Sequence, residues 1–462
     1  MSTTDVLVVG AGPAGLTTAI AAARNGADVL LVERRRGLSP HPRATGVSTR
    51  SMEIFHSWGL DAEIRAGALD AEPCMAITPS LHAPARQVLP LGYPTAVEAG
   101  TVSPVAPLCC PQDHIEPVLL AHLRRLGGRV RFAAELTDLT IGDGVRATFA
   151  DGDPVTARFV VGADGAHSAV RHALGIGVEQ LGSVGEFLNV QFRAELGAPR
   201  YVLFMIEGSD AREVLLPAGR GRWMYARQVR PDQDPPSRRE LVAALRRVTG
   251  VPDLDPTITA VQPFAMTGHV ATAFRAGPAF LVGDAAHRAT PMGGTGINTA
   301  IHAGHNLGWK LAWVARGRAG DGLLDTYAAE RRPIGVDNVL RSLGRGNPGT
   351  GSIVHDLGVT YGGAEPASAA ELSHVRVGGR APYQRGTTYD GGFTLLAGHP
   401  RWRGVTSDVS LNVVDDASVL SGGAALVRPD GHVAAIVSHP AELAAALTAL
   451  LDRAPSAWRR TA

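Results

Sequence analysis

The first hydrophobic segment of the chain is apolar at almost every position. Residues 5–9 (DVLVV) have the pattern of a strand buried on both faces, as in a parallel sheet. After a glycine-rich turn, apolar side chains recur at helical spacing as far as Gly26. A second apolar run then covers residues 29–32. The pattern predicts a strand–helix–strand unit at the N-terminus.

The turn inside this unit carries Gly10, Gly12 and Gly15, which form a GxGxxG pattern. The first glycine permits a tight turn, the second lets a pyrophosphate approach the backbone, and the third lets the helix lie close to the strand. The helix N-terminus adds N–H donors and the positive end of a dipole. Glu33 ends the second strand, where a carboxylate can accept hydrogen bonds from a ribose. The unit therefore predicts a dinucleotide site with contacts from Gly10, Gly12, Pro13, Ala14, Gly15, Glu33 and Arg34.

A second match to the glycine pattern occurs near the end of the helical region. Gly344, Gly346 and Gly349 have the same spacing, but they follow a polar stretch rich in arginine, and Pro348 interrupts them. Because no buried strand precedes this copy, we interpret it as a loop.

Two later segments also join a short apolar strand to a glycine-bearing turn. Residues 159–171 read FVVGADGAHSAVR. In residues 279–310 the apolar strand ends in Gly283-Asp284, and a second glycine-rich turn at residues 293–296 opens a helix.

The three segments together resemble the class A flavoprotein monooxygenases, the para-hydroxybenzoate hydroxylase-like group, in order and approximate spacing. The resemblance covers about residues 1–345. A simple NAD dehydrogenase would have only the first segment. The resemblance implies FAD as the cofactor and NADPH or NADH as a transient reductant. It also implies that O2 adds to the reduced flavin at C4a and that the distal oxygen passes to an electron-rich substrate carbon.

The resemblance assigns roles to individual residues. Asp284 would bind a ribityl hydroxyl of FAD, and Arg43 would meet the pyrophosphate. Gln112 would contact FAD, and Asp164 would shape the approach of FAD and the nicotinamide. The turn at the start of the last helix would offer backbone N–H groups to the flavin pyrimidine ring or the pyrophosphate. The further cofactor residues assigned in this way are Gly283, Pro291, Gly294, Gly296, Ile297 and Asn298.

Pro291 is also the residue that the resemblance places in the catalytic loop beside flavin and substrate. Each assignment has a structural alternative: Asp284 and Asp164 could cap turns, Arg43 could be a solvated loop residue, and Pro291 could stiffen a turn. His287, next to the third motif, is expected to be structural rather than a base.

Two positions depart from the commoner family pattern, because Thr295 stands where glutamine is common and Gly304 where aspartate is usual. These departures leave hydroxylation less firmly predicted than FAD binding.

A different pattern marks the middle of the chain. Residues 187–193, 201–206 and 223–229 have strand composition with rough alternation, and residues 238–247 read as a short surface helix. The resemblance makes this region a substrate-binding sheet over the flavin ring. The candidate substrate residues are Asn189, Gln191, Phe204, Trp223 and Tyr225. A register error of one residue would move all of them to the other face, and an aromatic stripe is also typical of a core.

The C-terminal region follows a linker at residues 362–370. It resembles an abbreviated form of the thioredoxin-like domain found in aromatic polyketide and phenol hydroxylases. It contains no cysteine, which excludes dithiol redox chemistry. A structural or oligomerisation role is therefore expected, and a homodimer is one such arrangement.

The expected fold class is α/β. It comprises a Rossmann-like FAD-binding domain of the GR2 type, an inserted β-sheet substrate domain and a C-terminal thioredoxin-like domain. The FAD-binding domain is predicted over residues 1–75, 106–179 and 263–361 (the last with connecting helices), the substrate domain over 76–105 and 180–262, and the thioredoxin-like domain over 371–462.

The composition limits the partners and the cellular location that we expect for this chain. The 44 basic and 43 acidic side chains nearly balance, which argues against nucleic acid or an anionic membrane as a partner. No apolar run approaches ~18 residues, and the N-terminus lacks the features of a signal peptide. The three cysteines form no CxxC and the histidines no HExxH set, so we expect a reducing, cytoplasmic location and no metal site.

We therefore predict an FAD-dependent monooxygenase that consumes NAD(P)H and O2 and acts through a C4a-hydroperoxyflavin. Its substrate would be a small aromatic, polycyclic phenolic or polyketide-type molecule of secondary metabolism, such as an antibiotic precursor. Epoxidation or Baeyer–Villiger oxygenation by the same cofactor stays open, as does a flavin-binding partner protein that does not oxygenate.

Overall fold

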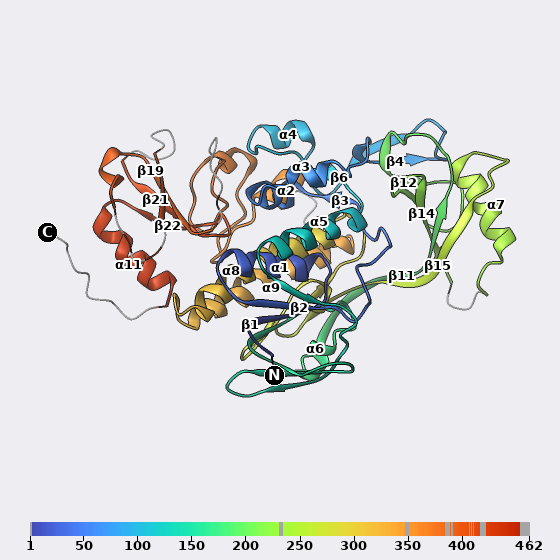
Figure 1. Cartoon of the computed structure of the whole chain (residues 1–462). Helices are drawn as coiled ribbons and strands as arrows, with labels where there is room; N and C mark the ends of the chain where they lie inside the picture. The colour runs from blue at the N-terminus through green and yellow to red at the C-terminus, as the bar shows by residue number, and fades with distance from the viewer. Residues whose placement is uncertain are drawn as a thin grey trace.

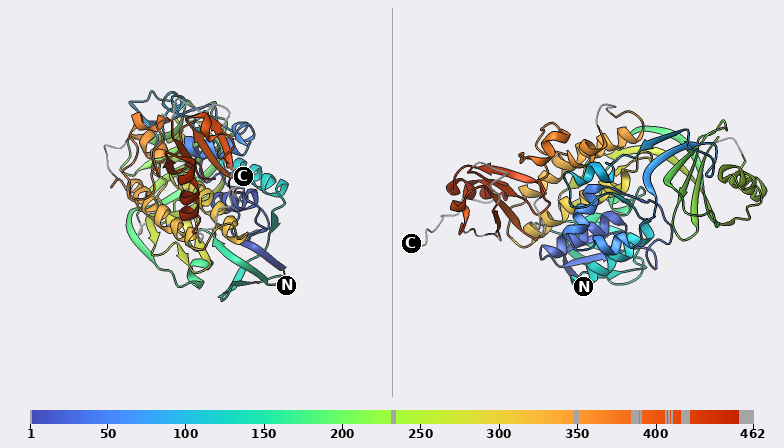
Figure 2. Two further views of the ribbon diagram at one scale, coloured as in Figure 1. Left: turned by 90° about the vertical axis from the view of Figure 1, so that its left-hand side faces the viewer. Right: turned by 90° about the horizontal axis from the view of Figure 1, so that it is seen from above.

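The computed structural model describes residues 2–230, 234–346, 351–383, 389, 391–405, 407, 409, 411–415 and 422–452. Three of the four β-sheets that the described residues form succeed one another along an elongated molecule (Figures 1 and 2). The sheet that contains the N-terminus lies in the middle with most of the helices. A second sheet forms one end, and the C-terminal sheet forms the other.

The central sheet is built on five parallel strands. In chain order these are β1 (Ser2–Val9), β2 (Val29–Val32), β7 (Arg129–Arg131), β10 (Val155–Gly162) and β17 (Ala279–Leu281). Their order across the sheet is β7-β2-β1-β10-β17, so the strand order reverses between β1 and β10. The sheet is completed by β8 (Leu136–Ile141), β9 (Val145–Phe149) and β16 (Arg275–Ala276). This is the doubly wound arrangement that the N-terminal pattern predicts.

Four long helices accompany this sheet: α1 (Pro13–Arg24), α5 (Gln112–Arg125), α8 (Gly296–Ala315) and α9 (Gly322–Ser342). The contact between α1 and α8 is unusually close, because it is made at glycines. A Cβ at Gly304 would lie 2.7 Å from the carbonyl oxygen of Ala14, and one at Gly308 would lie 2.6 Å from that of Thr18. The departure from aspartate at Gly304 thus has a packing reason: no side chain fits there.

The second sheet is mostly antiparallel, in the order β18-β15-β11-β14-β13-β12-β4-β5. Its strands are β4 (Glu72–Thr78), β5 (Gln87–Pro90), β11 (Val178–Arg193), β12 (Tyr201–Ile206), β13 (Glu213–Pro217), β14 (Arg222–Val229), β15 (Thr257–Ala271) and β18 (His287–Arg288). Helix α7 (Arg238–Thr249) covers one face, and a capping box between Ser237 and Glu240 fixes its start. Its Leu241 and Leu245 pack into the same apolar cluster as Val190 of β11.

The C-terminal module has its own four-stranded sheet in the order β20-β19-β21-β22, with α11 (Pro440–Leu450) after the last strand. Its strands are β19 (Phe393–Ala397), β20 (Leu411–Asp415), β21 (Ala424–Val427) and β22 (Val433–Val437). Only β19 and β20 are parallel, which is the strand arrangement of a thioredoxin core. In the described part of the β19–β20 connection, the 3-10 helix η3 (Pro400–Trp402) stands in place of a full helix. The predicted linker ends in another 3-10 helix, η2 (Ala369–Ser373).

Short elements complete the fold. They are β3 (Gly46–Val47), α2 (Thr49–Ser57), α3 (Asp61–Arg65), α4 (Ala96–Gly100), β6 (Leu108–Cys109), α6 (Ala169–Ala173), η1 (Gly283–Ala285) and α10 (Ser352–Leu357). Gly344 follows α9 as a turn residue with φ of +75°, whereas Pro348 and Gly349 of the second glycine pattern lie outside the described residues. Within the described part of the chain, no helix has the length and apolarity needed to cross a bilayer.

The segment expected at residues 76–105 divides between two surroundings. Strands β4 and β5 pair into the second sheet, but Gly92 and Tyr93 pack against the glycine-rich loop before α8. The exact domain boundaries stay predictions.

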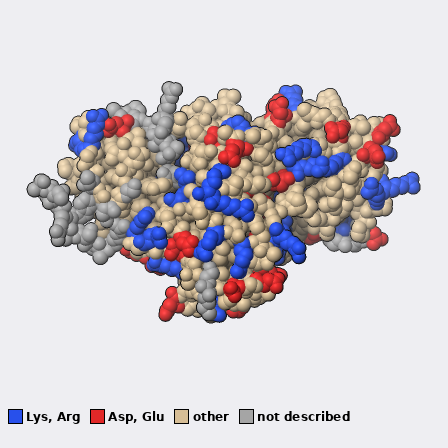
Figure 3. All heavy atoms as spheres, in the orientation of Figure 1, with Lys and Arg blue, Asp and Glu red and all other residues tan. Residues whose placement is uncertain are grey.

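Both signs of charge are spread over the face seen in Figure 3, with cations grouped toward its middle. The chain has one lysine, Lys310, and it is fully buried, so these cations are arginines. The distribution agrees with the nearly balanced charge of the sequence.

The α1–α8 contact gives a first prediction. Gly304→Ala should lower the free energy of unfolding by about 1–3 kcal/mol, because its Cβ would press on the backbone of α1. The measurement is the urea concentration at the midpoint of unfolding of the apoprotein, with unfolding monitored by circular dichroism.

Gly335→Ala in α9 is the matched control, because its Cβ would meet no atom closer than 3.4 Å. Alanine there should be neutral or stabilising by up to about 1 kcal/mol through helix propensity. Equal midpoints for Gly304→Ala and wild type would contradict the packing argument.

Candidate functional site

The loop after β1 leaves an open cradle at the start of α1. Gly10 has φ of +110°, and a Cβ there would lie 2.4 Å from the carbonyl oxygen of Ala163. A Cβ at Gly15 would lie 2.0 Å from the carbonyl oxygen of Gly10, whereas one at Gly12 would meet nothing within 4 Å. Gly12 is the N-cap of α1, and Pro13 occupies its first turn. The backbone N–H groups of this turn therefore face a space that a pyrophosphate can enter.

Glu33 fixes this loop from the end of β2. One carboxylate oxygen accepts a hydrogen bond from the Ala11 N–H at 3.0 Å, and the other accepts one from the Arg35 N–H at 3.0 Å. Each oxygen retains a lone pair that can accept a ribose hydroxyl. Arg34, predicted beside it, is exposed.

The three predicted motifs meet at one edge of the central sheet. Val9 pairs with Gly162, and Gly162 pairs in turn with Leu281, so the carboxyl ends of β1, β10 and β17 lie side by side. The loops that begin at Gly10 and Gly283 therefore open at the same edge. In open α/β sheets this edge, at the point where the strand order reverses, is where a nucleotide binds.

Asp284 lies in η1, directly after β17. Its side chain is in contact with solvent, but many protein atoms lie close to it. Among the described residues, none forms a hydrogen bond or ion pair with it. Burial raises the pKa of this carboxyl, while Arg288 and Arg43 act in the opposite direction. A carboxylate held in this way without a protein partner suits a ligand hydroxyl.

The N-terminus of α8 provides a second set of N–H donors. Its N-cap, Thr295, makes no side-chain capping bond, and the first-turn N–H groups of Gly296, Ile297 and Asn298 have no acceptor within the helix. The preceding loop, with Pro291 exposed and Gly294 at φ of +65°, leads into this turn.

The side chain of Asn298 has a structural role. Its Oδ1 accepts hydrogen bonds from the Ser48 N–H at 2.9 Å and the Ser51 hydroxyl at 2.8 Å. Its Nδ2 donates to the carbonyl oxygens of Gly294 at 3.0 Å and Gly46 at 3.2 Å. Only its backbone N–H is therefore free for the predicted cofactor contact.

Asp164 acts as a cap in this structure. Its Oδ2 accepts from the Val170 N–H at 3.1 Å, which holds the start of α6, and its buried Oδ1 has no partner among the described residues. This geometry favours the turn alternative for Asp164. Arg171 joins the second motif to the third, because its guanidinium donates to the carbonyl oxygens of Ala285 at 3.2 Å and Ala166 at 2.9 Å.

Gln112 opens α5 behind the same site. Its side-chain amide donates to Glu116 Oε1 at 2.6 Å, and its backbone N–H donates to Ala44, next to the exposed Arg43. Burial raises the pKa of Glu116 to about 7, against the lowering effects of Gln112 and Arg43. Gln112 thus couples the predicted FAD contact to a buried titratable group.

The five candidate substrate residues separate onto two faces of the second sheet. Asn189 and Gln191 alternate along β11 with Leu188, Val190 and Phe192, which pack under α7. They therefore occupy the other face, where Gln191 Oε1 lies 2.9 Å from Nδ1 of His41 in the loop after β2.

The prediction that Phe204, Trp223 and Tyr225 share that face is wrong. Val190 pairs with Tyr225 and Phe192 with Trp223, which places both aromatic rings on the α7 side. All three are buried in the α7 cluster, and the Tyr225 hydroxyl donates to Glu213. Their alternation is that of a core.

Tyr93 is a residue of the site that the sequence did not indicate. Its hydroxyl lies 3.7 Å from Cys109 Sγ and packs against Gly46, and its ring lies 3.5 Å from the position of a Cβ at Gly294. Arg341 holds the neighbouring Gly92 through its carbonyl oxygen at 3.1 Å. No motif marks this contact, because it joins short stretches that are distant in sequence.

The remaining polar groups near the motifs are structural. Burial lowers the pKa of His287 to about 3, so its ring is neutral. All three cysteines are free, and burial raises the pKa of the Cys109 and Cys110 thiols to about 12. No cluster of three or more metal-ligating side chains occurs among the described residues.

Asp284 gives the second prediction. Asp284→Asn should weaken FAD binding by tenfold or more, because a hydrogen bond to a charged acceptor contributes about 1.5–3 kcal/mol. The apoprotein should lose no stability, since the carboxylate has no protein partner among the described residues. Fluorescence titration of the apoprotein with FAD measures the affinity. The exposed Asp253→Asn is the control, and an unchanged FAD affinity in Asp284→Asn would refute the role.

Glu116 gives a prediction about pH. Its folded-state pKa of about 7 exceeds the ordinary value of 4.5, so the folded state binds the proton more tightly than the unfolded state does. The stability that the Glu116 proton contributes is therefore fully present below pH 4.5 and is lost as the pH rises through 7, by at most about 3 kcal/mol.

Glu116→Gln should remove this loss and make the apoprotein more stable than wild type at pH 8, but not at pH 4.5. Urea midpoints between pH 4.5 and 8 test the trend. Glu135→Gln, at an exposed position, should track wild type throughout.

Comparisons with known proteins identify the family. The model of a family described as "FAD binding domain" matches residues 3–342. A putative polyketide hydroxylase of Streptomyces halstedii is 34% identical over 93% of this chain and 92% of its own length. Aklavinone 12-hydroxylase of Streptomyces peucetius is 38% identical over 71% of each chain.

Among solved structures, aklavinone-11 hydroxylase in a ternary complex with FAD and aklavinone superimposes with a TM-score of 0.88. It is 29% identical, and the match covers 97% of this chain and 99% of that one. Together with the three motifs at one sheet edge, these similarities show that the chain is an FAD-dependent monooxygenase reduced by NAD(P)H and belongs to the class A flavoprotein hydroxylases, in the aromatic polyketide hydroxylase branch.

Proposed function

We propose that this enzyme hydroxylates a polycyclic phenolic substrate of the polyketide type, at a site between the edge of the central sheet and the Gln191 face of the second sheet. The observation that carries the proposal is the meeting of β1, β10 and β17 at one edge, with the unpartnered Asp284 carboxylate beside it. The relatives support the substrate class, since they include an aklavinone 12-hydroxylase and a tetracenomycin A2 monooxygenase-dioxygenase.

The residues present fit an FAD molecule along this edge. Gly12 and the α1 N-terminus would hold the pyrophosphate with help from Arg43, and Glu33 would hold the adenosine ribose. Asp284 would accept a ribityl hydroxyl, and the N–H groups that open α8 would face the flavin pyrimidine ring. When bound and reduced, the flavin would activate O2 and supply one oxygen atom to the substrate.

The protein itself orients the substrate and excludes water. Asn189 and Gln191 offer amide groups to phenolic or quinone oxygens, and the Phe187 and Phe264 rings, 5.7 Å apart, line the same strand pair. The link from Gln191 to His41 joins the substrate sheet to the loop that carries Arg43. A ring lying on this face would approach the loop that carries Pro291.

Several finer points are part of the proposal. O2 is the source of the inserted oxygen, and the chain works in the cytoplasm. Pro291 is proposed to contact flavin and substrate as part of a rigid loop.

The test is a screen of polycyclic phenols for accelerated NADPH and NADH oxidation under 18O2, with product mass and oxygen position recorded. A phenolic product heavier by one 18O atom supports hydroxylation. An epoxide or an inserted ester oxygen would assign the alternative chemistries. Bound FAD without any substrate-stimulated oxidation would contradict the proposal.

The two faces of the second sheet give a paired prediction. Gln191→Leu should raise the KM for the substrate severalfold without altering FAD affinity, because it removes an amide from the substrate face. Tyr225→Phe should leave KM unchanged and lower the free energy of unfolding by about 1 kcal/mol, because a buried hydrogen bond to Glu213 is lost. Steady-state kinetics and urea midpoints distinguish the two, and a reversed pattern would mean that the faces are assigned incorrectly.

A further inference from the structure

Helix α8 follows residues 291–295, the proposed flavin loop, and α2 begins next to the start of α8. Asn298, in the first turn of α8, accepts from the N–H of Ser48, the N-cap of α2, and donates to the carbonyl oxygen of Gly294. A movement of either helix therefore reaches Gly294 through one buried amide.

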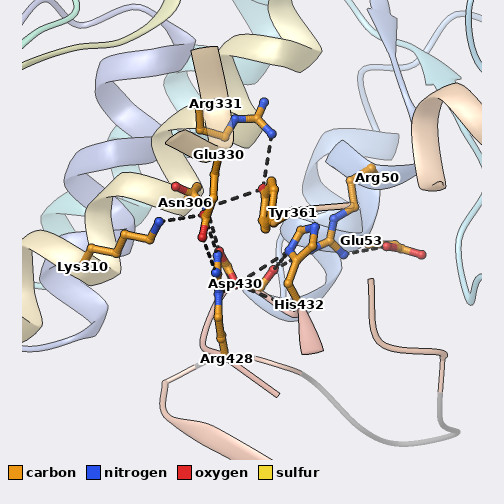
Figure 4. A network of polar contacts seen from close by, with 10 residues as sticks. All are labelled: Arg50, Glu53, Asn306, Lys310, Glu330, Arg331, Tyr361, Arg428, Asp430 and His432. Atoms are coloured by element: carbon orange, nitrogen blue, oxygen red, sulfur yellow. Dashed lines mark hydrogen bonds and ion pairs between the residues drawn. The ribbon is translucent and has the colours of Figure 1, made fainter. Parts of the chain in front are cut away.

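The same two helices also meet a single loop of the C-terminal module, residues 428–432 between β21 and β22 (Figure 4). Asp430 Oδ2 accepts from Asn306 of α8 at 2.9 Å, and the Asp430 carbonyl oxygen accepts from Arg50 of α2 at 2.6 Å. Asn298 and Asn306 lie on one helix, about 12 Å apart along its axis.

Arg428 of the same loop reaches α9. Its guanidinium pairs with Glu330 at 2.6 Å, and Glu330 also pairs with Lys310 of α8 at 2.7 Å. A second guanidinium near the start of the module, that of Arg380, pairs with Glu53 of α2 at 2.7 Å. The module thus contacts α2 and α9 through ion pairs and α8 through the amide of Asn306.

These charges are inside the protein. Asp430 is 1% exposed, Lys310 is not exposed, and Arg428 is 6% exposed. Burial alone would raise the pKa of Glu53 and Asp430, but their arginine partners lower both pKa values, that of Glu53 to about 2. Removing one partner would leave a buried charge with less compensation, which would destabilise this arrangement.

The space left beside the network is small. The cavity lined by Arg50, Glu53 and Arg380 measures about 40 Å³, which is room for a few water molecules. A substrate does not fit there, so the network is a contact between parts of the chain and not a second ligand site.

We propose that Asp430 and Arg428 are positioning residues for the flavin loop, and that the C-terminal module secures FAD by holding α2 and α8 in a fixed relation. The inference rests on the proposed contact of the residues that open α8 with FAD. It gives the module, which has no cysteine, a function in cofactor binding without any residue at the cofactor.

The test compares full-length Asp430→Asn and Arg428→Met with Arg403→Met. Arg403 forms an exposed pair with Asp415 in the same module and serves as the matched control. FAD affinity of each apoprotein is measured by fluorescence titration, without turnover. We expect a loss of tenfold or more for the two network variants and no change for the control. Wild-type affinity in both network variants would overturn the proposal.

Lys310 provides a separate readout of docking, since it is the only lysine and the N-terminus is the only other amine. Acylation of Lys310, followed by mass spectrometry, reports whether the module has left α8. Weak FAD binding by a network variant supports the proposal, whether Lys310 is protected or labelled. Labelled Lys310 with wild-type FAD affinity refutes it.

Should the charge variants fail to fold, Asn306→Ala replaces them, because Asp430 then keeps Arg428 as a partner. We expect a smaller loss of FAD affinity, about threefold, and no change would count against the proposal. Failure of the hydroxylation assay leaves this test intact, because it requires only that wild-type apoprotein bind FAD.

Discussion

The site depends on parallel strands that end at one edge. β1, β10 and β17 are distant in sequence, yet their register places Val9, Gly162 and Leu281 side by side. The loops that follow these strands therefore lie together in one region of the sheet edge. Glycine then decides how closely the layers approach, since any Cβ at Gly10, Gly15 or Gly304 would collide with backbone. In a nucleotide-binding fold of this kind, backbone N–H groups take the place of side chains as hydrogen-bond donors to the ligand. This explains why so few polar side chains lie at the edge itself.

Much of this arrangement can be predicted from the local pattern of apolar residues and glycines in the sequence. The strand–helix–strand unit over residues 2–32, the helix after Gly296 and the helix at 238–249 all have the composition and end signals of their elements. The turn glycines and Asp284 are local features as well, since each follows its strand directly. Where a motif is contiguous, its surroundings are fixed by a few neighbouring residues, and the prediction of its helices and strands succeeds for that reason.

The rest needs the tertiary structure. Which face of β11 is left for the proposed substrate site is decided by α7, whose leucines pack with Val190, Tyr225 and Trp223 on the other face. Tyr93 reaches Gly294 across 201 positions of the chain, and Asn306 reaches Asp430 across 124. Such contacts carry no local signal, because either partner alone looks like an ordinary loop or helix residue. The same holds for Asp164, whose cap on α6 is visible only in space.

The burial of Cys109 and Cys110 has a consequence for the lifetime of the enzyme. A flavoenzyme that activates O2 releases hydrogen peroxide whenever oxygen transfer misses its substrate, and peroxide attacks the thiolate form of cysteine. With thiol pKa values of about 12, these two side chains remain protonated at neutral pH. The protein can thus keep sulfur near the proposed flavin site in a form that peroxide attacks only slowly.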